Sequence, residues 1–411
     1  MRMFMLQCLR YFKYNYLLSN RLLYITIRTP SKIKEVFQTG KAWLKYFEAH
    51  KTDIRDVELE NMTNIMSCGL QVRGFQQFVC HTKGCHHTKK ICFSCNCRSC
   101  PTCGKMAIDR WIEDIKDIFP KCKYQHITFT MPDVLWQVFK DNRDRLGDLF
   151  KCACEPLLKT AKEKGIKVGI FSALHTYGRQ LNWNTHIHLS VSMGGLTKGG
   201  KWKDIRFSKN KIMPMWRYAV IKLIREIIND GYDKISKSQT KIQYERPWIV
   251  HFDKPTEHFE HTITYIGRYI KKPPIAMSKI KEYDGNTIKF KFLNHRNSKH
   301  QDLELTMDDF IERFIQHIPE KGFRMIRYYG FLANAVRGKL LPKIYEILGH
   351  RPKVKVDISY QQMSLLSFNV DPLKCILCGA QLLPSFRVIG KSTKQLMQFH
   401  TELASRKRIP A

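Results

Sequence analysis

The stretch that most restricts the fold of this chain is NWNTHIHLSVSMGG, residues 182–195. Polar and apolar side chains alternate through its middle, which is the pattern of a half-buried β-strand. Side chains two positions apart on a strand point the same way, so His186 and His188 project together while the aliphatic residues among them face a core. Two imidazoles about 7 Å apart along one strand face can bind a single ion. Because this pattern is common, other motifs must decide whether it is a metal site.

The segments around this strand indicate an antiparallel sheet. YQHITFTMP, residues 124–132, alternates in the same way. GIFSALHTYGRQLNWNTHIHL is typical of a strand, a turn at Gly178 and the histidine strand. Such a hairpin would bring His175 beside the pair as a third ligand. Gln180 and His261 are the alternatives for that position.

Half of the 14 cysteines fall between Cys80 and Cys103. One cluster in a large basic chain indicates metal binding inside the cell rather than a secreted disulfide framework. We expect a structural zinc site drawn from Cys80, Cys85, Cys95, Cys100 and Cys103. Two alternatives stay open, a second ion and an exchange of Cys95 for Cys85 as a ligand.

A second doublet, Cys375-x2-Cys378, lies near the C-terminus. It has no evident partner pair in the sequence, and His400 is a distant candidate. A metal half-site and a simple tight turn explain this doublet equally well.

The formal net charge is +34, from 70 Lys+Arg against 36 Asp+Glu. A field of that sign suits a polyanion, and the interleaving of cations with aromatic residues favours nucleic acid over a membrane surface. No apolar run is long enough for a transmembrane helix, so we expect no membrane partner and a cytoplasmic, nucleoid-associated protein. Residues 1–62 are predicted as a basic amphipathic helical segment, although an extension from an early start codon explains its beginning equally well.

The segment HTITYIGRYIKKPPIA, residues 261–276, places Tyr265 and Tyr269 four positions apart. On a helix they would share one face. The simpler interpretation is an amphipathic helix whose tyrosines lie where the hydrophobic core meets solvent. Beside a histidine-bound divalent ion, however, a tyrosine hydroxyl can attack a phosphodiester and conserve its energy in a phosphotyrosine link. The combination predicts a DNA-nicking site that uses Mg²⁺ or Mn²⁺.

Further cations and aromatic residues are candidates for DNA contact. Close to the tyrosines these are Arg268, Lys271 and Lys272, with solvated helix-end cations as the alternative. In GFRMIRYYGF they are Arg324, Arg327 and Tyr328, a combination typical of single-strand platforms. A core segment with snorkelling arginines is an equal alternative for that second group.

These motifs together resemble the rolling-circle HUH transposases of the IS91 type. The resemblance runs from about Cys68 to Cys378 and rests on ordered segments: CFSCNCRSCPTCGKMAIDRW, YQHITFTMPDVLW, LHTYGRQLNWNTHIHLSVSMGG, YIGRYIKKPPIA, FIERFIQHIPEKGFRMIRYYGFLA and DPLKCILCG. It implies that Tyr265 and Tyr269 are nucleophiles at single-stranded element ends. Each attack would leave a 5′-phosphotyrosine link and a free 3′-hydroxyl, and the displaced strand implies help from host replication machinery.

Two other functions compete with this one. A plasmid replication initiator or relaxase would use the same chemistry, and a non-catalytic zinc-dependent DNA-binding protein would use the tyrosines structurally. The oligomeric state is left undetermined by the sequence.

The fold class expected is α+β, with an antiparallel HUH-nuclease sheet flanked by helices. The predicted order is the segment 1–62, a zinc-binding module at 63–112, the catalytic domain with the tyrosine helix at 113–276, an accessory DNA-binding α+β region at 277–350 and a tail at 351–411 that contains the second cysteine doublet.

Overall fold

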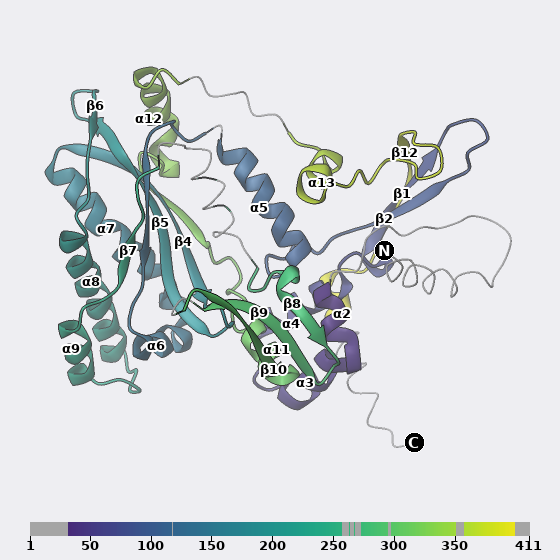
Figure 1. Cartoon of the computed structure of the whole chain (residues 1–411), viewed down its shortest axis with the longest axis horizontal. Helices are drawn as coiled ribbons and strands as arrows, with labels where there is room; N and C mark the ends of the chain where they lie inside the picture. The colour runs from purple at the N-terminus through teal and green to yellow at the C-terminus, as the bar shows by residue number, and fades with distance from the viewer. Residues whose placement is uncertain are drawn as a thin grey trace.

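The computed structural model describes residues 32–116, 118–256, 263, 267, 273–294, 297–350 and 357–398. Its strands form three antiparallel sheets with helices packed against them, which confirms the α+β class (Figure 1). None of the helices in these ranges is both long and apolar enough to cross a bilayer.

The largest sheet has the strand order β11-β4-β5-β3-β7, with β6 paired to β5. Its strands are β3 (Tyr124–Phe129), β4 (Ile166–Tyr177), β5 (Trp183–Thr197), β6 (Trp202–Asp204), β7 (Val250–Phe252) and β11 (Ile326–Gly330). The predicted strand at 124–132 and the predicted hairpin are therefore confirmed as β3 and as β4 with β5. The long central hairpin β4–β5 has neighbours on both sides, which fixes its register.

One face of this sheet is covered by helices and forms the main core. They are α6 (Trp136–Asp141), α7 (Asp148–Glu163) and α8 (Lys209–Asn229). Apolar residues of α7 recur every four positions and so share one helix face: Leu149, Ala153, Leu157 and Ala161. Beneath these helices lie the aliphatic side chains of β5, at most 1% exposed: Ile187, Leu189 and Val191. The histidines of β5 consequently point to the opposite face.

The second sheet, in the order β10-β9-β8, packs on helices from two distant parts of the chain. Its strands are β8 (Ile280–Tyr283), β9 (Thr287–Asn294) and β10 (Lys299–Thr306); its helices are α2 (Lys32–Gln38), α3 (Ala42–His50), α4 (Asp56–Ser67) and α11 (Met307–Ile315). Phe37 of α2 contacts Phe310 and Phe314 of α11, with ring centroids 6.1 and 5.2 Å apart. The N-terminal helices and α11 thus share one core.

This arrangement corrects the expected division of the chain. The predicted accessory region 277–350 is split between two units, because α11 packs with the N-terminal helices while β11 completes the large sheet. Helix α11 begins at Met307, because the Thr306 hydroxyl caps it by accepting from the Asp309 amide.

The third sheet is a ribbon of β1 (Gly74–Cys80), β2 (Thr88–Cys92) and β12 (Leu382–Ile389), in the order β12-β1-β2. It projects at the far end of the molecule from the large sheet, and α5 (Pro101–Lys116) runs between them (Figure 1). The remaining helices are α9 (Lys237–Glu245), α12 (Asn334–Ile347) and α13 (Tyr360–Phe368). The segment expected to be a C-terminal tail therefore contributes a strand to the N-terminal hairpin.

Candidate active site and metal centres

Three histidines converge on the face of the large sheet that α6, α7 and α8 leave uncovered. His175 of β4 lies directly opposite His186 of β5 in the strand pairing, and His188 follows two residues later on the same face. One ring nitrogen from each lies within 4.8 Å of those of the other two. The predicted convergence of His186 and His188 is confirmed, and His175 is the third histidine of the group. Gln180 lies exposed in the hairpin turn, whereas His261 lies outside the described residues.

The ring orientations suit a metal ion. His186 Nδ1 lies 2.8 Å from the Asn184 carbonyl oxygen, so Nδ1 carries the proton and donates it, which leaves the Nε2 lone pair available. His186 Nε2 and His188 Nε2 are 3.1 Å apart. Two nitrogens bound to one ion at about 2.1 Å would lie roughly 3.0–3.4 Å apart, depending on the coordination geometry. The observed spacing matches that requirement.

The protonation state also suits metal binding. Burial disfavours the charged imidazolium, so it lowers the pKa of His186 and takes the pKa of His188 well below the ordinary value. The neighbouring histidines depress the pKa of His188 further. Neutral imidazole is the ligand form, and the fold maintains it at neutral pH.

His126 of β3 is a part of this site that the sequence analysis missed. Its Nε2 lies 3.1 Å from His188 Nδ1, and its Nδ1 lies 3.2 Å from the Ser190 hydroxyl. The Thr128 hydroxyl is also 3.3 Å from His188 Nδ1. With Nδ1 of His188 as donor to these groups, its Nε2 is left to face His186. The alternation in YQHITFT placed His126 and Thr128 on one strand face, but only the pairing of β3 with β5 shows which histidine they contact.

Ile263, one of the two described positions of the segment 261–272, lies against the sheet face that carries the histidines. Phe171 and Ala173 precede His175 at alternate positions, and they pack in a cluster with Trp111 of α5 and Ile263. A Cβ on Gly267 would lie 2.5 Å from Cγ1 of Ile112, so this backbone approaches α5 closely. Ile263 and Gly267 are the described positions of the predicted tyrosine helix, and both are helical. The candidate residues Tyr265, Arg268, Tyr269, Lys271 and Lys272 lie outside the described residues.

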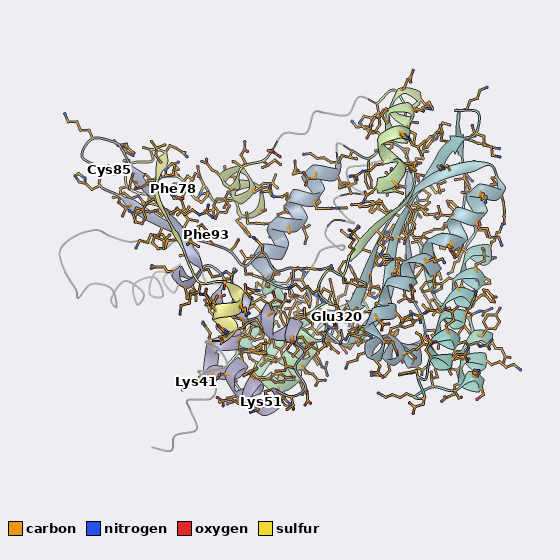
Figure 2. The ribbon with its side chains drawn as sticks, turned by 180° about the vertical axis from the view of Figure 1, so that it is seen from behind. Lys41, Lys51, Phe78, Cys85, Phe93 and Glu320 are labelled. Atoms are coloured by element: carbon orange, nitrogen blue, oxygen red, sulfur yellow. The ribbon has the colours of Figure 1, made fainter. Side chains whose placement is uncertain are left out.

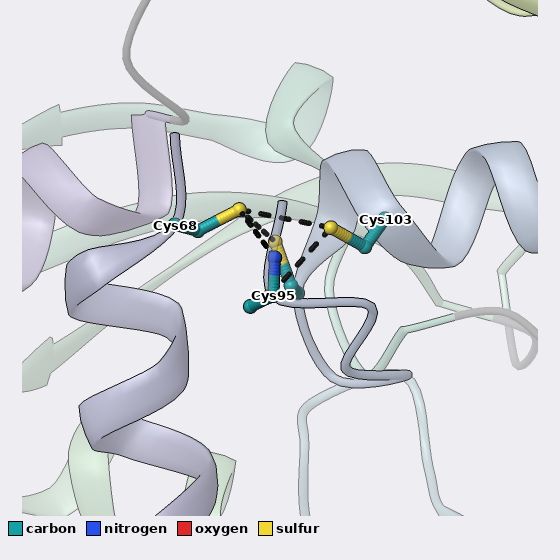
Figure 3. Close-up of side chains that lie close together, drawn as sticks. Cys68, Cys95 and Cys103 are labelled. Atoms are coloured by element: carbon teal, nitrogen blue, oxygen red, sulfur yellow. Dashed lines mark hydrogen bonds between the residues drawn. The ribbon is translucent and has the colours of Figure 1, made fainter. Parts of the chain in front are cut away.

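Four thiols meet at the base of the β1–β2 hairpin: Cys68, Cys95, Cys100 and Cys103. Figure 3 shows Cys68 reaching from the end of α4 toward Cys95 and toward Cys103 on α5. The Cys68–Cys103 and Cys95–Cys103 sulfur distances are both 3.6 Å. Sulfurs bound tetrahedrally to zinc at about 2.3 Å would lie about 3.8 Å apart. Cys68, which the sequence analysis omitted, supplies the fourth corner.

The remaining two predicted ligands, Cys80 and Cys85, do not belong to this cluster, so the structure does not bring all five predicted cysteines to one site. They lie at the opposite end of the hairpin with Cys375 and Cys378. A strand of seven residues spans about 20 Å, so thiols at the tip cannot reach the base. The unpaired C-terminal doublet was the signal that a second group of thiols exists.

The three candidates in GFRMIRYYGF differ in their surroundings. Arg324 is exposed, between two residues, Phe323 and Met325, that line an open cleft beside the Cys68 centre. Arg327 donates to the Gly147 carbonyl at 3.0 Å and stacks over Phe150. The Tyr328 hydroxyl accepts from Trp111 Nε1 at 3.1 Å. These internal contacts favour structural roles for Arg327 and Tyr328, in place of the predicted DNA contact.

Comparison with known proteins gives consistent matches over most of the chain. Residues 39–131 match a family model described as "Transposase zinc-binding domain", and residues 169–339 match one described as "Putative transposase". The chain is 38% identical to the transposase for insertion sequence element IS801 of Pseudomonas savastanoi pv. phaseolicola, over 90% of this chain and 92% of that protein. It is 26% identical to a putative transposase, y4qJ, of Sinorhizobium fredii, over 78% of this chain and 85% of that protein.

Among solved structures, the N-terminal nuclease domain of minute virus of mice non-structural protein 1 aligns with 52% of this chain and 96% of its own. The TM-score of this alignment is 0.22 and the sequence identity is 11%.

Proposed function

Because the chain belongs to the transposases of the IS91 type, we propose that it cuts and rejoins single-stranded DNA at the ends of its element through tyrosine. Tyr265 and Tyr269 are the proposed nucleophiles. A tyrosine oxygen attacks the phosphorus, the bond from phosphorus to the 3′-oxygen breaks, and that oxygen leaves as a 3′-hydroxyl. The 5′-phosphate then stays on the tyrosine, so the phosphodiester energy is conserved for rejoining.

The observation that supports this proposal most directly is the placement of the histidines. His175, His186 and His188 converge on the sheet face against which Ile263 packs, and Ile263 belongs to the same segment as both tyrosines. The three imidazoles would hold Mg²⁺ or Mn²⁺. Such an ion supplies polarisation of the phosphate oxygen and stabilises the charge that develops on it.

In this proposal, basic residues outside the histidine site bind and orient the DNA. The net charge of +34 provides the attraction for the phosphate backbone. Arg324, exposed between two residues that line the open cleft, is a proposed phosphate contact, and Arg268, Lys271 and Lys272 are proposed as further contacts from the sequence. Cys68, Cys95, Cys100 and Cys103 are the proposed ligands for the zinc ion of the zinc-binding domain.

The decisive experiment is a denaturing gel of full-length protein with labelled single-stranded oligonucleotides from the element's own ends and Mn²⁺. We expect an SDS-resistant protein–DNA adduct. This adduct should not form when the metal is chelated beforehand, nor in the Tyr265→Phe/Tyr269→Phe double variant. Tyr218→Phe is the matched control, because Tyr218 is 60% exposed on α8, which covers the opposite sheet face.

Two outcomes would contradict the proposal. An adduct that persists in the double variant would place the nucleophile elsewhere. Binding of the oligonucleotides without an adduct at any end would instead support a non-catalytic DNA-binding protein. The single variants assign the order in which the two tyrosines act, provided that the adduct forms.

A further inference from the structure

The tip of the projecting ribbon brings together two cysteine doublets about 300 positions apart in sequence. Cys80 ends β1, Cys85 lies in the β1–β2 turn, and Cys375 and Cys378 precede β12. Figure 2 shows Cys85 near the outer end of the ribbon, far from the large sheet. The four sulfurs all lie within 4.8 Å of one another.

The sulfur spacing fits a metal ion better than disulfides. The Cys80–Cys378 distance is 3.4 Å and the Cys85–Cys375 distance is 3.8 Å. A tetrahedral zinc site requires about 3.8 Å between sulfurs, whereas a disulfide requires about 2.05 Å. Each sulfur here has three others as near neighbours, which two disulfides would not produce.

Backbone amides point at two of the four sulfurs. The Ala380 amide donates to the sulfur of Cys378 and the His87 amide donates to that of Cys85, in both cases from two residues further along the chain. Gly379, with φ +76°, permits the tight turn that aims the Ala380 amide at the sulfur.

Buried groups beside the cluster compensate its charge. Four thiolates around one divalent ion carry a net charge of −2, which is costly away from water. Lys89 is only 2% exposed, and its ammonium donates to the Pro372 carbonyl just before the second doublet. His87 Nδ1 lies 3.2 Å from the Cys375 sulfur. A lysine buried this deeply is expected where anionic groups lie nearby, and the groups that act on Lys89 are Asp371 and, next, Cys375.

Apart from its strand pairing, the tip of the ribbon has only a small core. In β12 only Leu382 is buried; it packs with Cys80 and Cys375, and Phe78, Cys85 and Ala380 lie partly buried against them. Sheets this small need a hydrophobic face or another constraint to be stable. The thiols occupy the place that a core would fill.

We propose that Cys80, Cys85, Cys375 and Cys378 bind a second zinc ion, distinct from the Cys68 centre, that fastens β12 to the β1–β2 hairpin. The family's zinc-binding model covers residues 39–131 and so contains one half of this site. The other half comes from the opposite end of the chain. This zinc ion therefore makes the N-terminal and C-terminal regions one folded unit, independently of whether the proposed tyrosine chemistry is correct.

The test is a zinc count on purified full-length protein by elemental analysis, with Cys→Ser variants. Cys375→Ser/Cys378→Ser is expected to contain one equivalent of zinc fewer than the wild type. Cys80→Ser/Cys85→Ser should lose the same single equivalent, and the variant with all four substitutions should lose no more than that. Cys122→Ser, a cysteine outside both clusters, is the control and should lose none.

Zinc content equal to wild type in either double variant would overturn the proposal, as would losses that add to two equivalents in the fourfold variant. Hydrogen exchange then tests the fastening. In Cys375→Ser/Cys378→Ser the amides of β1 and β12 should exchange faster while those of β4 and β5 stay as protected as in the wild type. Unchanged protection of β12 despite the lost zinc would show that the ion does not hold the strand.

Discussion

His126 packs directly behind His188, and its ring fixes the orientation of that ligand from the neighbouring strand. We expect His126→Ala to weaken Mn²⁺ binding about 10–100-fold, because groups that orient metal ligands typically contribute that much. His126→Gln, whose amide can replace one ring nitrogen, should recover part of the loss. Isothermal titration with Mn²⁺ measures both.

His251→Ala is the matched control for this prediction. His251 pairs with Thr128 in the strand register but is exposed, and its Nε2 donates to the Asp253 carboxylate at 2.7 Å. An equal loss of Mn²⁺ affinity in His251→Ala would show a general electrostatic effect and not the loss of ligand orientation. An unchanged Mn²⁺ affinity in His126→Ala would show that His126 does not position His188.

Protonation of the buried side chain of His317 makes the unfolding free energy of the protein depend on pH. Burial is the main cause that lowers its pKa to about 3, and the positive charges of Arg143 and Lys140 add to that effect. Its Nε2 donates to the Leu181 carbonyl at 3.0 Å, and its Nδ1 accepts from the Thr176 hydroxyl at 3.2 Å. In the unfolded chain the pKa returns to about 6.5.

The stability from neutral His317 is therefore complete above about pH 6.5 and is lost as the pH falls toward 3. Between pH 7 and pH 5 the wild type should lose about 2 kcal/mol more unfolding free energy than His317→Gln, because only its unfolded chain gains this proton. Urea unfolding at the two pH values measures the difference. Equal pH dependence in both proteins would show that His317 is not held neutral.

At the level of elements, the packing of the 263–267 segment against α5 depends on the absence of a side chain at Gly267. Gly267→Ala would push a Cβ to 2.5 Å from Cγ1 of Ile112. We expect a loss of about 1–3 kcal/mol in unfolding free energy, as for other overpacked interfaces. Thermal unfolding followed by circular dichroism checks it.

The control is Gly338→Ala in α12, where a Cβ would meet nothing within 4 Å. There the same substitution should stabilise the helix by roughly 0.5–1 kcal/mol. Ile112→Ala, which removes both Cγ1 and Cδ1, should destabilise the Gly267→Ala protein less than it destabilises the wild type if the clash is the cause. A stabilising Gly267→Ala would mean that this helix can move away from α5 without cost.

At the level of the whole molecule, the Cys68 centre belongs to a core shared by distant segments. Cys95, Cys100 and Cys103 lie in the same cluster as Phe37 and Phe310. Removing this zinc should therefore unfold more than the cysteine loop. We expect Cys68→Ser/Cys103→Ser to destabilise α2–α4 and α11 by several kcal/mol, at the large end of substitution effects.

Hydrogen exchange on the intact protein measures this prediction. Faster exchange should appear across the N-terminal helices and α11, whereas Cys375→Ser/Cys378→Ser should affect the ribbon alone. Faster exchange confined to residues 95–103 would show that the core holds without its metal.

How much of this the sequence could predict follows from the range of the interactions. The alternation in NTHIHLSVS is a local signal, and because strand side chains alternate strictly, it set both the buried face and the convergence of His186 and His188. The turn at Gly178 similarly placed His175 opposite His186. Each of these depends on residues within a few positions of one another.

The rest required contacts between residues far apart in the chain. His126 became part of the site only through the pairing of β3 with β5, and Arg327 and Tyr328 were engaged only once β11 lay between α5 and α7. Cysteine spacing restricts ligands within one loop but does not select partners across a chain, so the sequence left the doublet at Cys375 unpaired. The length of the β1–β2 hairpin separated the thiols at its base from those at its tip, and the return of β12 to β1 brought the second doublet to that tip.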